Sequence, residues 1–199
     1  MPKLQLSDIL QFTELLNTFT GIKRVCYIPK TNIRENDVEH SYGLAILAWY
    51  IAENSSIVLD KNLVLKYALI HDLVEVYAGD TYLYSENQND HDSKKEREES
   101  ARLRILEEFP LFKDLHKTIL DYEKREDEES RFVYVLDKIH PVIQMYLDNG
   151  RMWKEQKVTL AMLIEKKADK ALLSTELLPY WDELLKLLTE SEDKLFHKK

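Results

Sequence analysis

Three segments of the chain are apolar on almost every side and still carry ionisable side chains. The clearest is the stretch that ends at Gly79, in which apolar residues recur at helical spacing: Leu63, Tyr67, Ile70, Val74 and Tyr77. A helix that is apolar all round is normally buried in the middle of a domain. The pattern therefore predicts a buried helix from a cap at Asp60 to a stop at Gly79, and two more central helices at about 38–53 and 132–147.

The rest of the chain predicts amphipathic helices joined by loops. The expected helices lie at about 7–19, 93–108, 110–122, 158–173 and 175–196, with loops at 22–36 and 81–92. No alternating pattern of useful strand length, internal repeat or linker occurs. We therefore predict an all-α fold of about seven to nine helices in one domain over residues 1–199. Its core covers about 12–150, and C-terminal helices at about 158–197 pack on it.

Composition narrows the class of protein. Few glycines and prolines favour helix, and the single cysteine, Cys26, excludes an internal disulfide. The start of the chain lacks the apolar run of a signal peptide, and no run of about 18 apolar residues predicts a membrane span. We therefore expect a cytoplasmic protein. The net charge of −8 argues against stable nucleic-acid binding, although a small anionic substrate could bind where a metal or a few basic residues supply positive charge.

The ionisable residues of the three central segments form the candidate site. They are His40, His71, Asp72, Glu75 and Asp137. A buried carboxylate is costly unless it is paired or bound to a metal, and two His with two Asp suit Mn²⁺, Co²⁺, Fe²⁺ or Zn²⁺. His71 and Asp72 are roughly 100° apart around a helix, so they could hold an ion from two sides. Glu75, one turn past His71, could accept a proton or orient His71.

A second His-Asp pair provides an internal control. His91-Asp92 lies among Asn and Asp residues, where we expect loop surface without a function. A lone His on an apolar helix is more often a hydrogen-bonded core residue than a ligand. His71-Asp72 differs from His91-Asp92 in its apolar setting, and it differs from a lone histidine in the acidic residues that follow it, Glu75 and Asp80.

Three groups of residues together resemble the motif of the HD-domain metal-dependent phosphohydrolases. In order along the chain they are Glu39-His40-Ser41, then His71-Asp72-x-x-Glu75-x-x-x-Gly79-Asp80, then Asp137. The branch with bacterial 5′-deoxynucleotidases and related eukaryotic HD-domain proteins is the most similar. The resemblance covers about residues 12–147. It implies a helical HD fold and a divalent ion (Mn, Co, Fe, Zn or Mg) bound by His40, His71, Asp72 and Asp137.

The resemblance also implies roles for three further residues. Glu75 and Asp80 match residues needed for activity, which share water activation and substrate positioning in an order that we leave open. Arg24 matches an arginine that contacts the substrate phosphate. In the bacterial enzymes a tryptophan that helps select deoxyribose follows this arginine, whereas Val25 stands here. The departure leaves the sugar preference open and does not affect the metal ligands.

The residues and the resemblance together predict a metal-dependent phosphoric monoester hydrolase that acts on nucleoside 5′-monophosphates. One alternative is hydrolysis of a triphosphate, cyclic or modified nucleotide at the same site. The other is a metal-bearing interaction protein without turnover. Beyond Gly150 no motif is found, and the apolar helix with Leu184, Leu185, Leu187 and Leu188 fits either a homodimer interface or core packing.

Overall fold

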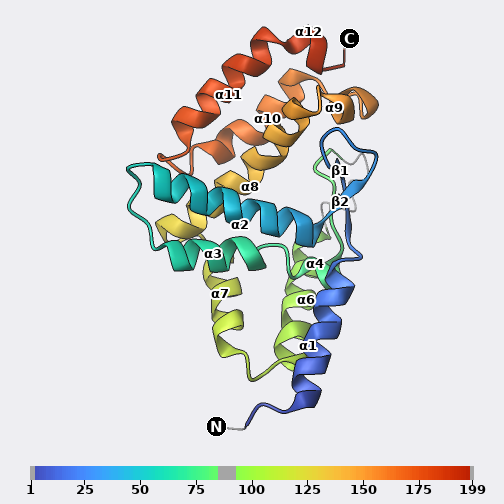
Figure 1. The fold of residues 1–199 in the computed structure, drawn as a ribbon, viewed down its shortest axis with the longest axis vertical. Coiled ribbons are helices and arrows are strands. Elements are labelled where there is room, and N and C mark those ends of the chain that lie inside the picture. The colour runs from blue at the N-terminus through green and yellow to red at the C-terminus, as the bar shows by residue number, and fades with distance from the viewer. Residues whose placement is uncertain (1–2, 85–92, 198–199) are drawn as a thin grey trace.

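The computed structural model describes residues 3–84 and 93–197, and these residues are mostly helical (Figure 1). Eight of their helices have ten or more residues, as expected, and three are single turns. The long helices are α1 (Leu6–Phe19), α2 (Asp37–Asn54), α3 (Lys61–Ile70), α6 (Lys94–Glu108), α7 (Lys113–Lys124), α8 (Glu128–Leu147), α10 (Leu160–Ala171) and α11 (Leu178–Glu190). The short ones are α4 (Glu75–Ala78), α9 (Arg151–Glu155) and α12 (Glu192–Leu195). The all-α prediction is confirmed.

Helices α2, α3 and α8 occupy the middle of the molecule in Figure 1, between α1, α6 and α7 at the end near the N-terminus and α9–α12 at the end near the C-terminus. Side chains from all three central helices are fully or almost fully buried, among them Leu44, Tyr67 and Phe132. The C-terminal helices contribute to the same core through Leu163, Trp181 and Leu188. Two of the three central helices that the pattern predicts, α2 and α8, have nearly the expected bounds.

The N-terminus of α2 is fixed by a reciprocal cap. The side chain of Asn36 accepts a hydrogen bond from the backbone N–H of Glu39 at 2.9 Å, and the Glu39 carboxylate accepts one from the Asn36 N–H at 3.0 Å. Both backbone donors lack a partner within the helix, so the box satisfies them and sets where α2 begins. His40, the next residue, is thereby placed in the first turn with a fixed orientation.

The prediction of one continuous helix between Asp60 and Gly79 is wrong, because the helix is interrupted in the middle of this range. Helix α3 ends at Ile70, residues 71–74 form a tighter turn, and α4 begins at Glu75. The His71 ring makes a 2.9 Å hydrogen bond through Nδ1 to the carbonyl of Ala68. That carbonyl is the acceptor that the Asp72 amide would use in a continuing α-helix, so ring and backbone compete for it.

The expectation of no strands is also wrong. Residues 22–36, which are predicted as a loop, contain an antiparallel pair, β1 (Lys23–Tyr27) and β2 (Arg34–Asn36), with an irregular register inside β1. Strands of five and three residues are too short to show an alternating pattern. The hairpin lies beside the start of α2 in Figure 1 and carries Arg24 to the candidate site.

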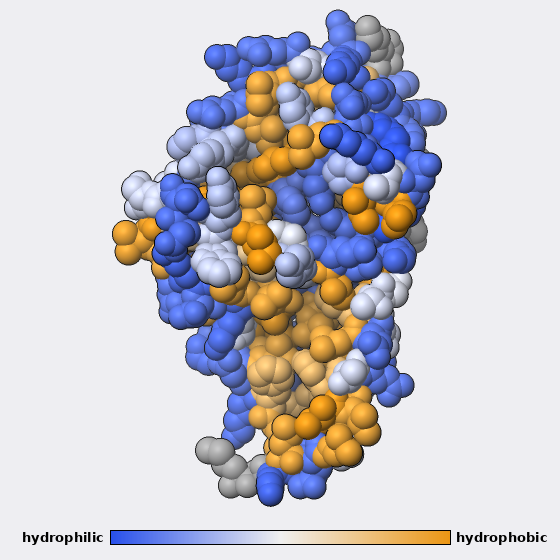
Figure 2. Space-filling view, in the orientation of Figure 1, coloured by the Kyte–Doolittle hydropathy of each residue, from blue (hydrophilic) through white to orange (hydrophobic). Residues whose placement is uncertain are grey.

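Exposed apolar side chains gather on one face of the molecule. Figure 2 shows them over its lower half, where α1 and α7 lie in Figure 1, and Ile9, Leu10 and Leu16 of α1 are among the exposed apolar residues. On α11, by contrast, Leu184 and Leu188 belong to the core, which accounts for much of the apolar character of that helix. None of the helices in residues 3–84 and 93–197 is both long enough and apolar enough to span a membrane.

Candidate metal centre

The structure brings the four predicted metal ligands together from three elements. His40 comes from the first turn of α2, His71 and Asp72 from the turn after α3, and Asp137 from α8. One ligand atom from each lies within 4.8 Å of every other. Nε2 of His40 is 3.0 Å from Oδ1 of Asp137, and Nε2 of His71 is 3.0 Å from Oδ2 of Asp72. A cluster of two imidazoles and two carboxylates at these separations is suited to a divalent ion.

The hydrogen bond that His71 makes through Nδ1 leaves its Nε2 available to a metal ion. Its Nδ1 bonds to the Ala68 carbonyl, which can only accept, so Nδ1 carries the proton and Nε2 faces the two aspartates. This buried Nε2 lies 3.0 Å from Oδ2 of Asp72 and 3.6 Å from Oδ1 of Asp137, so only the carboxylates of the cluster face it. An atom of this kind is expected to bind a proton or a metal.

The charges around His71 and Asp137 explain their proton affinities without a metal. Burial alone would lower the pKa of His71, but the charge of Asp72 and hydrogen bonds to both aspartates raise it to about 10. Burial likewise disfavours ionised Asp137, yet Lys138 and the two imidazoles hold its pKa well below the usual range. The cluster therefore binds positive charge in its centre, which is the property that a divalent cation requires.

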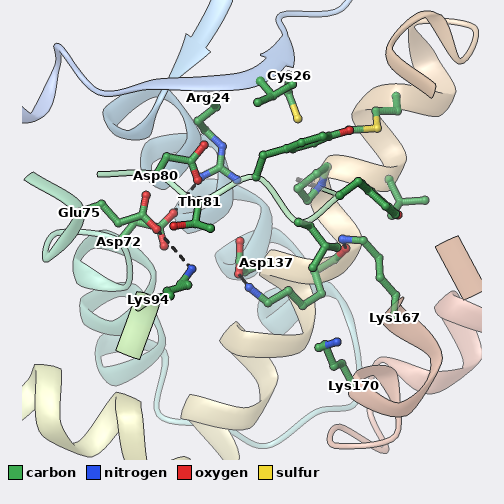
Figure 3. Close-up of a pocket in the computed structure, with 18 of the residues that line it drawn as sticks. Arg24, Cys26, Asp72, Glu75, Asp80, Thr81, Lys94, Asp137, Lys167 and Lys170 are labelled. Carbon is green, nitrogen blue, oxygen red and sulfur yellow. Dashed lines mark hydrogen bonds and ion pairs between the residues drawn. The ribbon is translucent and has the colours of Figure 1, made fainter. Parts of the chain in front are cut away.

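The cluster opens into a pocket of about 150 Å³ (Figure 3). Arg24 lines it from β1, and its Nη1 lies 2.9 Å from Oδ2 of Asp72 and 3.3 Å from Oδ1 of Asp37. Asp37 is fully buried and was not predicted as a site residue. It lies three residues before His40, and residues at this spacing share a face of a helix, so the spacing could have indicated it. A guanidinium held between two carboxylates at a pocket wall is oriented to receive an anion.

Glu75 and Asp80 line the same pocket, and Figure 3 shows both beside Asp72 and Arg24. Glu75 is 4% exposed, and burial together with the negative charges of Asp72 and Asp80 raises its pKa to about 10. Among the described residues, its Oε2 has no hydrogen-bond partner, and its Oε1 lies 3.8 Å from Nζ of Lys94. The pKa of Asp80 is also raised, chiefly by burial. Both side chains can thus take up and release protons inside the pocket.

Sequence reasoning missed three lysines that line the pocket, Lys138, Lys167 and Lys170. Figure 3 shows Lys167 and Lys170 on the side away from Glu75. Lys138 donates to Oδ2 of Asp137 at 2.6 Å, and Nζ of Lys167 donates to the backbone carbonyl of Lys138 at 2.7 Å. Lys170 lies on the same turn of α10. Lys138 could have been found because it follows a predicted ligand. Nothing in the C-terminal pattern distinguishes Lys167 and Lys170 from surface lysines.

The control pair His91-Asp92 lies outside the described residues, so its predicted surface position stays a prediction. All seven residues predicted for the site, by contrast, are described. Five of them line the pocket, and the two histidines lie behind two of these five, in contact with Asp137 and Asp72. The five are Arg24, Asp72, Glu75, Asp80 and Asp137.

Comparisons with known proteins agree with this architecture. A family described as "HD domain" matches residues 21–177. The human protein "5′-deoxynucleotidase HDDC2" is 28% identical over 140 residues, which cover 69% of this chain and 66% of that protein. In Schizosaccharomyces pombe, "5′-deoxynucleotidase hdd1" is 29% identical over 119 residues, 56% of this chain and 57% of that one. The matched region thus spans about two thirds or less of these two relatives.

A solved structure supports the comparison. The crystal structure of a predicted metal-dependent phosphohydrolase from Magnetospirillum magnetotacticum MS-1 is 29% identical and superposes with a TM-score of 0.81. The superposition covers 96% of this chain and 98% of that one. The likeness therefore includes the C-terminal helices, which the sequence motif did not reach.

Proposed function

Because the chain belongs to the HD domain family, we propose that it is a divalent-metal-dependent phosphohydrolase that cleaves nucleoside 5′-monophosphates to nucleoside and phosphate. One observation carries the proposal: the four-residue cluster opens directly onto a pocket that contains Arg24. The names of the matched relatives, 5′-deoxynucleotidases, support the same reaction.

The pocket can bind a phosphate although the protein as a whole is acidic. Arg24, Lys94 and Lys138 line it close to the carboxylate cluster, so a dianion meets local positive charge in a chain of net charge −8. Arg24 can hold two phosphate oxygens at once through its planar fork of N–H donors. The hydrogen bonds that it now makes to Asp37 and Asp72 would hold the guanidinium in place for this.

A divalent ion held by His40, His71, Asp72 and Asp137 would supply Lewis acidity, which offsets charge on the phosphoryl group and favours a nucleophile derived from water. Glu75 is the group that we assign to the proton transfer. Its carboxyl group is buried in the pocket and has an oxygen without a hydrogen-bond partner among the described residues, so it can exchange a proton with a bound water. The neighbouring carboxylates raise its pKa, and the positive charge of a divalent ion beside Asp72 would lower that pKa toward the range of a general base. Asp80, on the same side of the pocket, would position the substrate.

The remaining pocket walls suit a nucleoside. Tyr82 and Tyr84 line the pocket with ring centroids 5.6 Å apart, and Met145 and Trp153 add apolar surface. The hydroxyl of Tyr84 is buried and has no hydrogen-bond partner among the described residues. A flat base could contact the aromatic rings while its polar edge or the sugar meets this hydroxyl.

A second candidate function rests on Lys167 and Lys170. Lys170 adds a cationic side chain at the far side of the pocket, and a bound anion would raise the lowered pKa of Lys167 and keep its amine protonated. Together the two lysines would favour a substrate with several phosphates, as in a nucleoside triphosphate. The two candidates differ in their product. Monophosphate hydrolysis releases inorganic phosphate, whereas a triphosphate substrate releases phosphate, pyrophosphate or triphosphate according to the bond that is cut.

The test is a substrate panel assayed with chelated protein and one divalent metal added back at a time. We expect no turnover after chelation, recovery with at least one metal, and phosphate release from 5′-monophosphates. Full activity of metal-free protein would overturn the proposal. Stoichiometric metal binding without hydrolysis of any mono-, tri- or cyclic nucleotide would instead indicate a metal-bearing interaction protein.

A further inference from the structure

We propose that Glu35 is a positioning residue that orients both a metal ligand, His40, and the phosphate-binding Arg24. The inference rests on the proposed function, because it concerns the ion and the phosphate that this function requires. Neither the sequence motif nor the comparisons assign a role to Glu35. It lies on β2, next to the cap residue Asn36, and is only 4% exposed.

One carboxylate oxygen of Glu35 faces two donors from the site. Its Oε2 lies 3.5 Å from Nδ1 of His40 and 3.5 Å from Nε of Arg24. Its other oxygen, Oε1, accepts a hydrogen bond from Nε2 of Gln144 at 2.7 Å. Gln144 lies on α8, the helix that carries Asp137. The Glu35 side chain is therefore held at one end by α8 and directed at the other end toward both functional groups.

All three facing atoms are buried and lack any other hydrogen-bond partner among the described residues. These atoms are Oε2 of Glu35, Nδ1 of His40 and Nε of Arg24. Buried polar atoms without partners are costly, and a shift of a few tenths of an ångström would join all three. A carboxylate oxygen has two lone pairs and can accept from both donors at once.

The contact determines which nitrogen of His40 is available to a metal. If Nδ1 donates its proton to Glu35, Nε2 keeps its lone pair, and Nε2 is the atom that lies 3.0 Å from Asp137 in the ligand cluster. A carboxylate behind a ligating imidazole fixes the tautomer and ring orientation and makes the imidazole a better ligand. Glu35 thus does for His40 what the Ala68 carbonyl does for His71.

The contact with Arg24 connects the metal ligands to the phosphate subsite. Nε of Arg24 faces Glu35, while Nη1 bonds to Asp37 and Asp72. Three carboxylates therefore fix the guanidinium from its back and one side. Removing the charge of Glu35 should loosen both His40 and Arg24, so metal affinity and phosphate affinity should fall together.

The test is the nearly isosteric variant Glu35→Gln, compared with wild type by calorimetric titration of chelated protein with Co²⁺. We expect the dissociation constant to rise about 10- to 100-fold, as is typical when the partner of a ligating histidine is removed. The visible absorption of bound Co²⁺ should change, and the dissociation constant for inorganic phosphate should rise as well. The matched control is Glu39→Gln, which neutralises the residue next to His40 whose carboxylate caps α2. The amide oxygen of glutamine can still accept the hydrogen bond from the Asn36 N–H, so the cap and the placement of His40 are retained and the metal affinity of Glu39→Gln should equal that of wild type.

A purely structural role would have a different signature. It would lower the midpoint of thermal unfolding but leave the Co²⁺ constant and spectrum of the folded protein unchanged, and this result would overturn the proposal. If Glu35→Gln does not fold, Gln144→Leu keeps the carboxylate and removes the hydrogen bond that holds it. It should weaken Co²⁺ binding in the same direction by a smaller factor, and an unchanged constant would again refute the role.

The metal titration does not depend on turnover, so the proposed function and the role of Glu35 can be refuted independently of each other. Wild-type protein that binds Co²⁺ and hydrolyses no nucleotide contradicts the proposed function, while a weakened Co²⁺ constant in Glu35→Gln still supports the role of Glu35. Conversely, an active wild type with a Glu35→Gln variant of equal Co²⁺ affinity and KM contradicts only the role of Glu35.

Discussion

The two sides of the pocket differ in the partners that their ionisable side chains have. The motif side consists of five ionisable residues, Arg24, Asp72, Glu75, Asp80 and Lys94 (Figure 3). The lysine side consists of Lys138, Lys167 and Lys170. On the motif side most charges are paired with opposite charges. On the lysine side, the buried amine of Lys167 donates to a backbone carbonyl.

The difference indicates which functional residues can be recognised from the sequence alone. Carboxylates in apolar helices violate the usual pattern, and the violation is local, so it is visible along the chain. A lysine on an amphipathic C-terminal helix violates nothing, and its burial depends on which helices pack against it. The motif side and its neighbours along the chain should therefore control the chemistry and the sugar preference, whereas the lysine side should mainly affect stability. Four substitutions test this division.

Asp72→Ala on the motif side should have the largest effect. It removes one of the four proposed metal ligands and the nearest partner of Arg24, so kcat/KM should fall by about 10³-fold or more, the order expected when electrostatic stabilisation of the transition state is lost. Metal content should fall in parallel, and the helical circular dichroism signal should be retained. Asp92→Ala, which also removes an aspartate that follows a histidine, is the control and should behave as wild type. More than a tenth of wild-type activity in Asp72→Ala would contradict the assignment.

Glu75→Gln should have the next largest effect. Loss of a positioned proton acceptor should lower kcat by about 10²-fold. Metal bound at the cluster of His40, His71, Asp72 and Asp137 should stay stoichiometric, because Glu75 is not one of these four residues. The control is Glu98→Gln, since Glu98 also pairs with Lys94, at 3.2 Å, but does not line the pocket. Equal losses of activity in both variants would place the effect in Lys94 and not in proton transfer.

Val25→Trp should change substrate choice by a smaller factor. Val25 lines the pocket next to Arg24, where the bacterial deoxynucleotidases that the sequence resembles have a tryptophan. The bulkier ring should crowd a ribose 2′-hydroxyl, so the ratio of kcat/KM for a deoxyribonucleotide to that for its ribonucleotide should rise about tenfold, an energy of roughly 1.4 kcal/mol. Val25→Leu serves as the control. An unchanged ratio in the tryptophan variant would show that Val25 does not face the sugar.

Lys167→Met should have the smallest effect, on stability and its pH dependence. Burial and the charge of Lys138 lower the pKa of Lys167 from 10.5 to about 7. Between these two pH values the unfolded chain binds more protons than the folded one, so the free energy of unfolding that Lys167 contributes rises with pH. Methionine cannot titrate, so any stability advantage of the variant should be largest below pH 7 and shrink toward pH 10.5.

Thermal unfolding of wild type, Lys167→Met and the exposed control Lys166→Met between pH 6 and 10 measures this difference. The expected change in the midpoint is a few degrees. If the difference between Lys167→Met and wild type does not depend on pH, the amine is not buried in the folded protein as described. The homodimer and the cytoplasmic location stay predictions, which sedimentation of the protein and its distribution in fractionated cells would test.

Much of the site was determined by the sequence alone. Helical periodicity is a local property, so the central helices α2 and α8 and the ionisable residues on them could be predicted with nearly correct bounds. The cost of burying His71, Asp72 and Asp137 without partners made a metal cluster the expected solution, and the HD family membership predicted from the motif is confirmed.

Only the tertiary structure decided the rest. The break after Ile70 arises because the His71 ring takes a backbone acceptor, which periodicity cannot show. The hairpin that places Arg24 and Glu35 is too short for a strand pattern and is fixed by its packing beside α2. Lys167 reaches the pocket because α10 packs against α8, a contact between segments about 30 residues apart. Local physics therefore determined which groups perform the chemistry, and non-local packing determined which groups surround the substrate.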